Sequence, residues 1–208
     1  MKKLFTLLVV LLFSAVGHAK YYKAVLYMQD GTNKTGLAEL VDMEDSKVYF
    51  KSNEEAKTEK ISSTDLTRIV YTYDTGQIVT MDYLYLTSEN IFSKKISKSK
   101  KKKWFTILYS KDFKIGRIDD KGSHGPNNFR AASSSYFFEK NGSDQLVFGF
   151  NSLGSITKSY GTDARIKKMA KETFVDCPKL IEAVEKETFT LDTALNQMIA
   201  IFATIKCN

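Results

Sequence analysis

The sequence predicts an α+β fold: a small N-terminal β barrel or meander, a second β meander and a C-terminal helical bundle with one disulfide. Short segments of alternating polarity run to about residue 150, and the hydrophobic period then changes to 3.6 near Thr162. The chain also carries only two cysteines, Cys177 and Cys207. With 208 residues, 43% hydrophobic and 26% charged, the composition is globular and excludes collagen-like, mucin-like and wholly disordered chains.

Residues 1–19 have the pattern of a secretory signal peptide. Lys2 and Lys3 precede roughly 13 mainly apolar residues, fewer than the ~18 that span a bilayer, and small residues follow. We expect cleavage between Ala19 and Lys20, with cleavage after Gly17 as the alternative. The protein is therefore expected to be periplasmic or secreted, in an oxidising compartment.

Residues 20–92 predict the small β barrel or meander. Turn residues such as Asp30-Gly31 separate short strand-like stretches, and residues 62–66 predict one helical turn before a late strand. The strand-like stretches are 22–29, 36–41, 47–51, 58–61, 68–73 and 77–86. The order of Asp30-Gly31, Gly36, an aromatic strand at 47–51 and Ile61-Ser62-x-x-Asp65-Leu66 resembles SH3-like or Sm-like barrels. Such barrels share a fold without sharing a function.

Residues 93–103 are rich in lysine, and we expect them to form an exposed connector, because like charges at this density repel one another. Lys100, Lys101, Lys102 and Lys103 are the candidate anion-binding residues. They predict at most weak, salt-sensitive contact with anionic lipid or another polyanion. Specific nucleic-acid binding is not expected, because no aromatic residues alternate with the lysines to stack on bases.

Residues 104–161 predict the second β meander, in which Asn141-Gly142-Ser143-Asp144 forms a hairpin turn. Residues 162–208 predict three helices. Thr162 precedes a stripe of Ile166, Met169, Ala170 and Phe174, and Pro178 suits the first position of the second helix. The last helix spans about 192–206.

A disulfide between Cys177 and Cys207 is the most economical use of two cysteines in an exported protein. The last two helices are expected to form an antiparallel hairpin, which places the start of one beside the end of the other. Closing a loop of about 31 residues stabilises a fold by roughly 3.5 to 4 kcal/mol in the chain-entropy estimate.

The C-terminal sequence also resembles a known group. Phe174-Val175-Asp176-Cys177-Pro178-Lys179-Leu180, followed by a terminal Lys206-Cys207-Asn208, is similar to the C-terminal signature of small exported proteins of Bacteroidetes-type bacteria. The resemblance covers about the last 45 residues. It implies a periplasmic or surface location and no particular chemistry.

Catalytic motifs are scarce in this sequence. One histidine, His124, lies beyond the leader, and no nucleophile elbow, phosphate loop or zinc-protease motif occurs. No catalytic residue, metal ligand or cofactor is predicted. The pairs Tyr71/Tyr73 and Tyr83/Tyr85 offer either a platform for a sugar or peptide or cross-strand packing. We expect a non-catalytic binding or structural module with an unknown protein or glycan partner in the envelope. The alternative is a polymer hydrolase whose carboxylates have no local motif.

Overall fold

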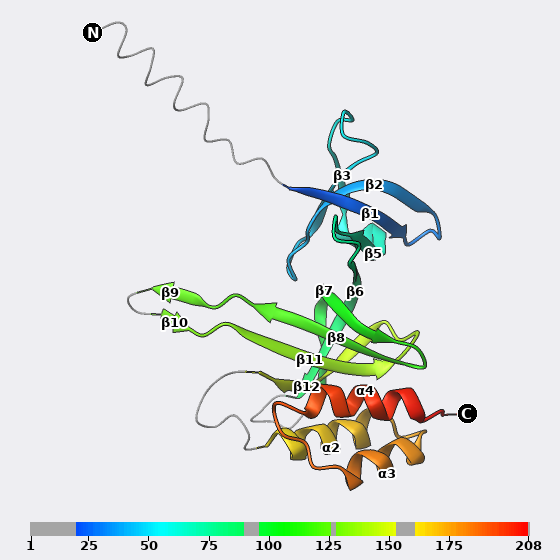
Figure 1. Cartoon of the computed structure of the whole chain (residues 1–208), viewed down its shortest axis with the longest axis vertical. Coiled ribbons are helices and arrows are strands. Elements are labelled where there is room, and N and C mark those ends of the chain that lie inside the picture. Colours follow the sequence, from blue (N-terminus) through cyan, green and yellow to red (C-terminus); the bar gives the residue numbers. More distant parts are fainter. Residues whose placement is uncertain (1–19, 90–95, 126–127, 153–160, 208) are drawn as a thin grey trace, which may run out of the picture.

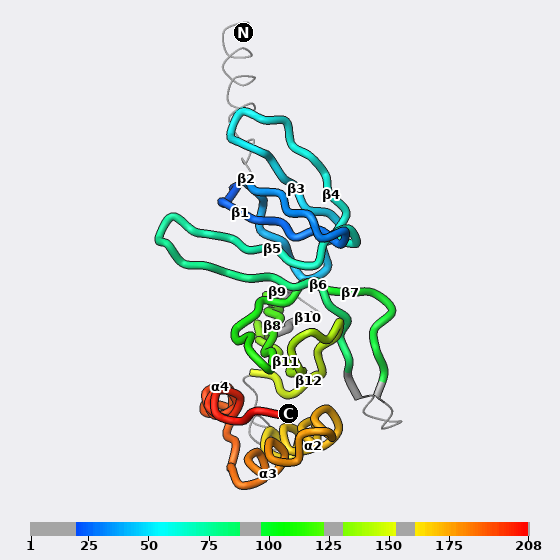
Figure 2. Tube along the Cα trace, turned by 90° about the vertical axis from the view of Figure 1, so that its right-hand side faces the viewer, coloured from blue at the N-terminus to red at the C-terminus, as the bar shows by residue number. Residues whose placement is uncertain are grey.

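The computed structural model describes residues 20–89, 96–125, 128–152 and 161–207, and these form a mixed α+β protein. Three layers are stacked along its long axis (Figures 1 and 2). The first strands form the upper layer, the later strands form the middle layer, and three helices lie against the middle layer. Residues 1–19, which the sequence predicts to be a signal peptide, are outside the described residues, and these include Ala19 of the predicted cleavage site.

The upper layer is an antiparallel sheet in the order β5-β1-β2-β3-β4, in which β1 to β4 form a meander and β5 returns to pair with β1. Its strands are β1 (Tyr21–Met28), β2 (Asn33–Glu39), β3 (Lys47–Lys51), β4 (Glu59–Ser62) and β5 (Leu66–Thr72). Gly31 has a φ of 85° in the β1–β2 turn, a conformation that favours glycine. The 3₁₀ turn η1 (Ser63–Asp65) precedes β5, as the sequence predicted. No barrel is evident among the described strands of this layer.

Two long strands join the upper and middle layers into one ten-stranded sheet. β6 (Ile78–Glu89) pairs with β5 through its first residues, and it pairs with β7 (Ile96–Ser110) along much of its length. The prediction of an exposed connector is therefore wrong over residues 96–103, while residues 93–95 are outside the described part. Lysines can occupy a strand here because turns from elsewhere in the chain supply carboxylates: Asp144, before β12, pairs with Lys98, and Glu44, before β3, pairs with Lys103.

The middle layer continues through β8 (Phe113–Asp120), β11 (Ser133–Lys140) and β12 (Gln145–Asn151). The pairing then returns to β6, because Gln145–Val147 of β12 run parallel to Tyr85–Thr87. β9 (Ser123–Gly125) and β10 (Asn128–Arg130) form a separate two-stranded extension. The predicted hairpin turn at 141–144 joins β11 to β12.

The helical layer contains α2 (Thr162–Thr173), α3 (Pro178–Lys186) and α4 (Ala194–Thr204). Phe202 of α4 is buried among aromatic rings of the sheet and of the chain between the helices. Its ring centroid lies 4.6 Å from that of Phe113, 5.7 Å from Phe174 and 6.0 Å from Phe138. Burial of this apolar cluster holds the helices on the sheet.

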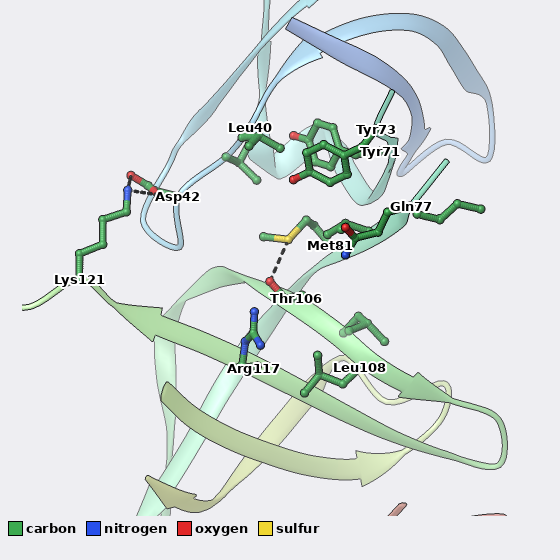
Figure 3. Close-up of a pocket in the computed structure, with 14 residues that line it drawn as sticks. Leu40, Asp42, Tyr71, Tyr73, Gln77, Met81, Thr106, Leu108, Arg117 and Lys121 are labelled. Carbon is green, nitrogen blue, oxygen red and sulfur yellow. Dashed lines mark hydrogen bonds and ion pairs between the residues drawn. The ribbon is translucent and has the colours of Figure 1, made fainter. Parts of the chain in front are cut away.

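Trp104 of β7 joins the upper and middle layers. Its side chain is fully buried and belongs to the core of the upper layer. Its indole Nε1 donates to Ser63 Oγ at 3.1 Å and to the Asp45 carbonyl at 3.2 Å. On another side of this junction, Lys121 Nζ lies 3.0 Å from Asp42 Oδ1, so an ion pair also links the layers (Figure 3).

Candidate binding groove

Three of the predicted anion-binding lysines line one hollow. Lys100, Lys101 and Lys102 border a cavity of about 500 Å³. The other lining residues are Gln29, Ser46, Thr64, Tyr83 and Tyr85. The fourth predicted residue, Lys103, does not line this hollow and instead forms an ion pair with Glu44. The lysine run therefore contributes one wall of a shaped site.

The ring of Tyr85 contacts two lysine side chains. Lys98 Nζ is 4.2 Å and Lys102 Nζ is 5.3 Å from the centroid of its ring. This contact follows from the register, because Tyr85 and Lys102 are direct partners on β6 and β7. Tyr83 has a different role: it is buried against Trp104, with ring centroids 4.9 Å apart, and burial raises its pKa. Tyr83 thus supports the wall, and Tyr85 holds the ammonium groups.

A second hollow of about 390 Å³ adjoins the first, since Gln29, Tyr83 and Lys102 line both. The turn 141–144 closes it with amide, hydroxyl and carboxylate groups. Its remaining lining residues are Tyr27, Thr67, Arg68, Asp82, Leu84 and Lys114. We call the two hollows together the tyrosine–lysine groove. The groove thus combines lysines, tyrosines and neutral polar groups.

A buried ion triad lies at the second hollow. The carboxylate of Asp82 accepts a hydrogen bond from Lys114 Nζ at 2.6 Å. It also accepts two from the Arg68 guanidinium, at 2.6 and 3.0 Å. The side chains of Asp82 and Lys114 are only 3% and 6% exposed. Two cations at hydrogen-bond distance compensate the buried acid, so the triad supports the groove structurally.

Lys100 and Lys101 are exposed and have no ion-pair partner among the residues that the structure describes. They contrast with Lys98, which pairs with Asp144 at 2.9 Å, and with Lys103. Two uncompensated ammonium groups beside an aromatic ring give this wall a local positive charge. Such a wall attracts anions, and salt screens the attraction.

A buried glutamate, Glu139 of β11, bears on the hydrolase alternative. Burial raises its pKa, and its Oε1 accepts a hydrogen bond from the Lys140 amide at 2.9 Å. Asp82 lines the groove whereas Glu139 does not. A glycoside hydrolase needs two carboxyl groups that flank the same bond. The two buried carboxyl groups of the described chain are therefore not both at this groove.

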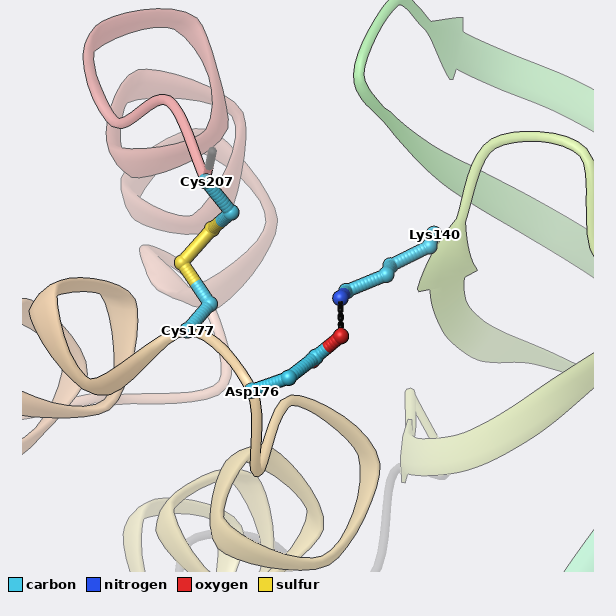
Figure 4. The surroundings of a disulfide bond; sticks show 4 residues. All are labelled: Lys140, Asp176, Cys177 and Cys207. Carbon is cyan, nitrogen blue, oxygen red and sulfur yellow. Dashed lines mark hydrogen bonds and ion pairs between the residues drawn. A yellow bond between two sulfur atoms is a disulfide. The ribbon is translucent and has the colours of Figure 1, made fainter.

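The predicted disulfide is confirmed. Cys177, just before α3, is bonded to Cys207, which follows α4, and their Cα atoms are 5.3 Å apart (Figure 4). Beside it, Lys140 of β11 forms an ion pair with Asp176 and so ties the helical layer to the sheet. Both cysteines are bonded, so neither offers a thiol nucleophile.

The remaining sequence candidates are Lys20 and His124. Lys20 is exposed at the start of the described chain, and its Nζ lies 4.9 Å from the Tyr22 ring. His124 lies on β9, and its side chain is outside the described part. Among described side chains, no three His, Cys, Asp or Glu residues gather as metal ligands. Of the helices that the structure describes, none is long and apolar enough to cross a membrane.

Sequence reasoning missed the groove because its walls come from distant segments. Gln29 follows β1, Ser46 precedes β3, and the turn 141–144 follows β11. Only the contact between Tyr85 and Lys102 had a signal within neighbouring strands of the sequence. Had β6 and β7 been recognised as a hairpin, strand alternation would have placed Tyr85 opposite Lys102.

Comparison of the chain with protein-family models, with curated proteins and with solved structures finds no significant match. The function must therefore be inferred from the geometry of the chain itself.

Proposed function

We propose that this protein is an exported, non-catalytic binding module that holds an anionic glycan of the cell envelope in the tyrosine–lysine groove. The observation that carries the proposal is the hollow in which Lys100, Lys101 and Lys102 lie beside Tyr83 and Tyr85. The shared chemistry of the ligand is a sugar that bears carboxylate or phosphate groups.

The groove favours a chain ligand over a flat membrane. Gln29, Ser46 and Thr64 line the hollow beside the lysines and offer amide and hydroxyl groups for sugar hydroxyls. Lysines on a flat or convex face would suit a bilayer of anionic lipids. Here they line a hollow, which a narrow polymer can enter.

A binding role is favoured over hydrolysis. The groove has one buried carboxylate, Asp82, and Lys114 and Arg68 occupy its oxygens. A general acid needs a protonated carboxyl, and a nucleophile needs an accessible oxygen. Asp82 is poorly placed for either role. Turnover of polygalacturonate by the protein would favour the hydrolase instead.

Export is part of the proposal. The basic and apolar pattern of residues 1–19 supports a leader that is cleaved between Ala19 and Lys20. The Cys177–Cys207 disulfide suits the periplasm or the exterior. The C-terminal resemblance to small exported Bacteroidetes-type proteins points to the same location.

The fold resemblance of the upper layer to SH3-like or Sm-like barrels is a separate part of the proposal. It is supported by η1 before β5 and by the β1–β5 pairing.

The proposal is tested by measuring affinity for polygalacturonate at low salt, with neutral dextran and phosphatidylglycerol vesicles as comparison ligands. We expect saturable polygalacturonate binding, weaker vesicle binding and none to dextran. The variant K100Q/K101Q should bind about 10- to 30-fold more weakly, since each lysine contributes ~1 kcal/mol near a polyanion. Its thermal stability should be unchanged, because both side chains are exposed.

The matched control is K179Q/K206Q, which removes the same charge from exposed positions of the helical segment. It should bind polygalacturonate like the unmodified protein. Equal losses in the two variants would mean that net charge alone drives binding, and the groove would then be rejected as the site. Stronger binding to vesicles than to polygalacturonate would identify a lipid surface as the ligand.

A further inference from the structure

A separate cleft lies between the upper and middle layers and shares no lining residue with the tyrosine–lysine groove. Its volume is about 740 Å³, within the range of small-molecule sites. Tyr71, Tyr73 and Leu40 face it from above, while Thr106, Leu108 and Arg117 face it from below (Figure 3).

Much of the cleft wall is apolar. Leu40 is 45% exposed and Ile78 is 65% exposed, and both line the cleft. They are two of the four large apolar side chains that are exposed in the described chain. Val79 and Leu108 extend the same wall. Exposed apolar residues gathered at a concave site, rather than scattered singly, mark a place where an apolar group binds.

Two hydrogen-bond donors at this wall lack strong partners. Arg117 Nε is buried and has no hydrogen-bond acceptor, although Arg117 Nη2 lies 2.9 Å from Asp119 Oδ2. The Thr106 hydroxyl donates only to the sulfur of Met81 at 3.3 Å, and a thioether is a weak acceptor. Thr106 and Arg117 are direct register partners on β7 and β8, so the two donors are neighbours.

A buried donor without an acceptor is unfavourable, and a guanidinium presents its donors as a fork that fits a carboxylate. A small rotation of the Arg117 side chain would allow Nε and a terminal nitrogen to grip two oxygens. Asp119 already compensates part of this cation. A ligand with a single negative charge therefore suits the site better than a phosphate dianion.

We propose that this cleft binds a small monocarboxylate with an apolar chain, with its carboxylate at Arg117 and Thr106 and its chain against Ile78, Val79 and Leu108. The Lys121–Asp42 ion pair borders the same cleft and links the two layers. The site is independent of the glycan proposal because it uses different residues.

The test is calorimetric titration of the exported protein with octanoate, and with 1-octanol and octylammonium as chain-matched neutral and cationic probes. We expect saturable binding of one octanoate, at least tenfold weaker binding of octanol, and none of octylammonium. Arg117→Gln should weaken octanoate binding about tenfold, because hydrogen bonds to charged groups are the stronger ones. Arg165→Gln is the matched control. Arg165 is an exposed residue of α2, it lies over the Phe148 ring, and it does not line the cleft.

A second variant protects the test if Arg117→Gln fails to fold. Ile78→Glu changes an exposed side chain at the cleft, so it should fold and should repel octanoate, with at least a tenfold loss. The proposal is overturned if octanoate does not bind, if octanol binds equally well, or if Ile78→Glu leaves octanoate binding unchanged. Equal losses in Arg117→Gln and Arg165→Gln would overturn it as well.

Discussion

Replacing Asp82 with Asn should be among the most destabilising single changes in the sheet. Lys114 is 6% exposed and has Asp82 as its ion-pair partner, so the substitution leaves a buried ammonium without a carboxylate. Breaking a buried pair in this way costs about 3–5 kcal/mol. Arg68→Gln should cost only about 1–2 kcal/mol, because Asp82 keeps Lys114 at 2.6 Å and Arg68 is partly exposed.

A second substitution, Lys114→Met, tests whether the loss of stability comes from the unpaired charge or from a general loss of packing. Lys114→Met in the Asp82→Asn background removes the unpaired charge, so the double variant should be more stable than Asp82→Asn alone by about 1–2 kcal/mol. Urea unfolding followed by the fluorescence of the single tryptophan, Trp104, measures all three variants. If the double variant is less stable than Asp82→Asn, or if Asp82→Asn costs under about 1 kcal/mol, the triad does not support the groove.

Three further changes test the rest of the fold. The double variant Cys177→Ser/Cys207→Ser should have a free energy of unfolding lower by at most about 3.5 to 4 kcal/mol. A reductant should destabilise the unmodified protein and leave the variant unchanged. A variant that is still destabilised by reductant would contradict this. Glu139→Gln should stabilise the protein at pH 8 but not below pH ~4. The pKa of Glu139 is raised in the folded state, so this carboxyl disfavours the fold only once it ionises. A gain in stability that does not change with pH would refute ionisation as the cause. Gly116→Ala should cost about 1–3 kcal/mol, because its Cβ would lie 2.3 Å from Leu146 Cδ1 in the core, and an unchanged melting temperature would refute that packing.

The helical layer could be predicted from sequence because its signals are local. The 3.6-residue stripe after Thr162 and the proline at the start of α3 each involve residues within a few positions of one another. The disulfide was predicted from the count of two cysteines in an exported protein, and the expected antiparallel helices supported it by placing Cys177 near Cys207. The turn η1 before β5 was likewise encoded in five adjacent residues.

The strand that carries the lysines could not be predicted, because strand pairing is decided by distant residues. Charge repulsion within 93–103 argued for an exposed connector, but Glu44 and Asp144, each more than 40 positions from its lysine, compensate part of the charge. The buried indole of Trp104 donates hydrogen bonds to Ser63 and Asp45, which lie about 40 and 60 positions away in the upper layer. The groove was missed for the same reason.

The most direct test of the glycan-binding account is the position of protected lysines on the folded protein. Acetylation of lysines with and without polygalacturonate, read by peptide mass spectrometry, maps where the polymer lies. The account predicts protection of Lys100, Lys101 and Lys102 and unchanged modification of Lys179 and Lys206. Protection of Lys179 and Lys206, or equal protection across the surface, would contradict a ligand bound in the groove.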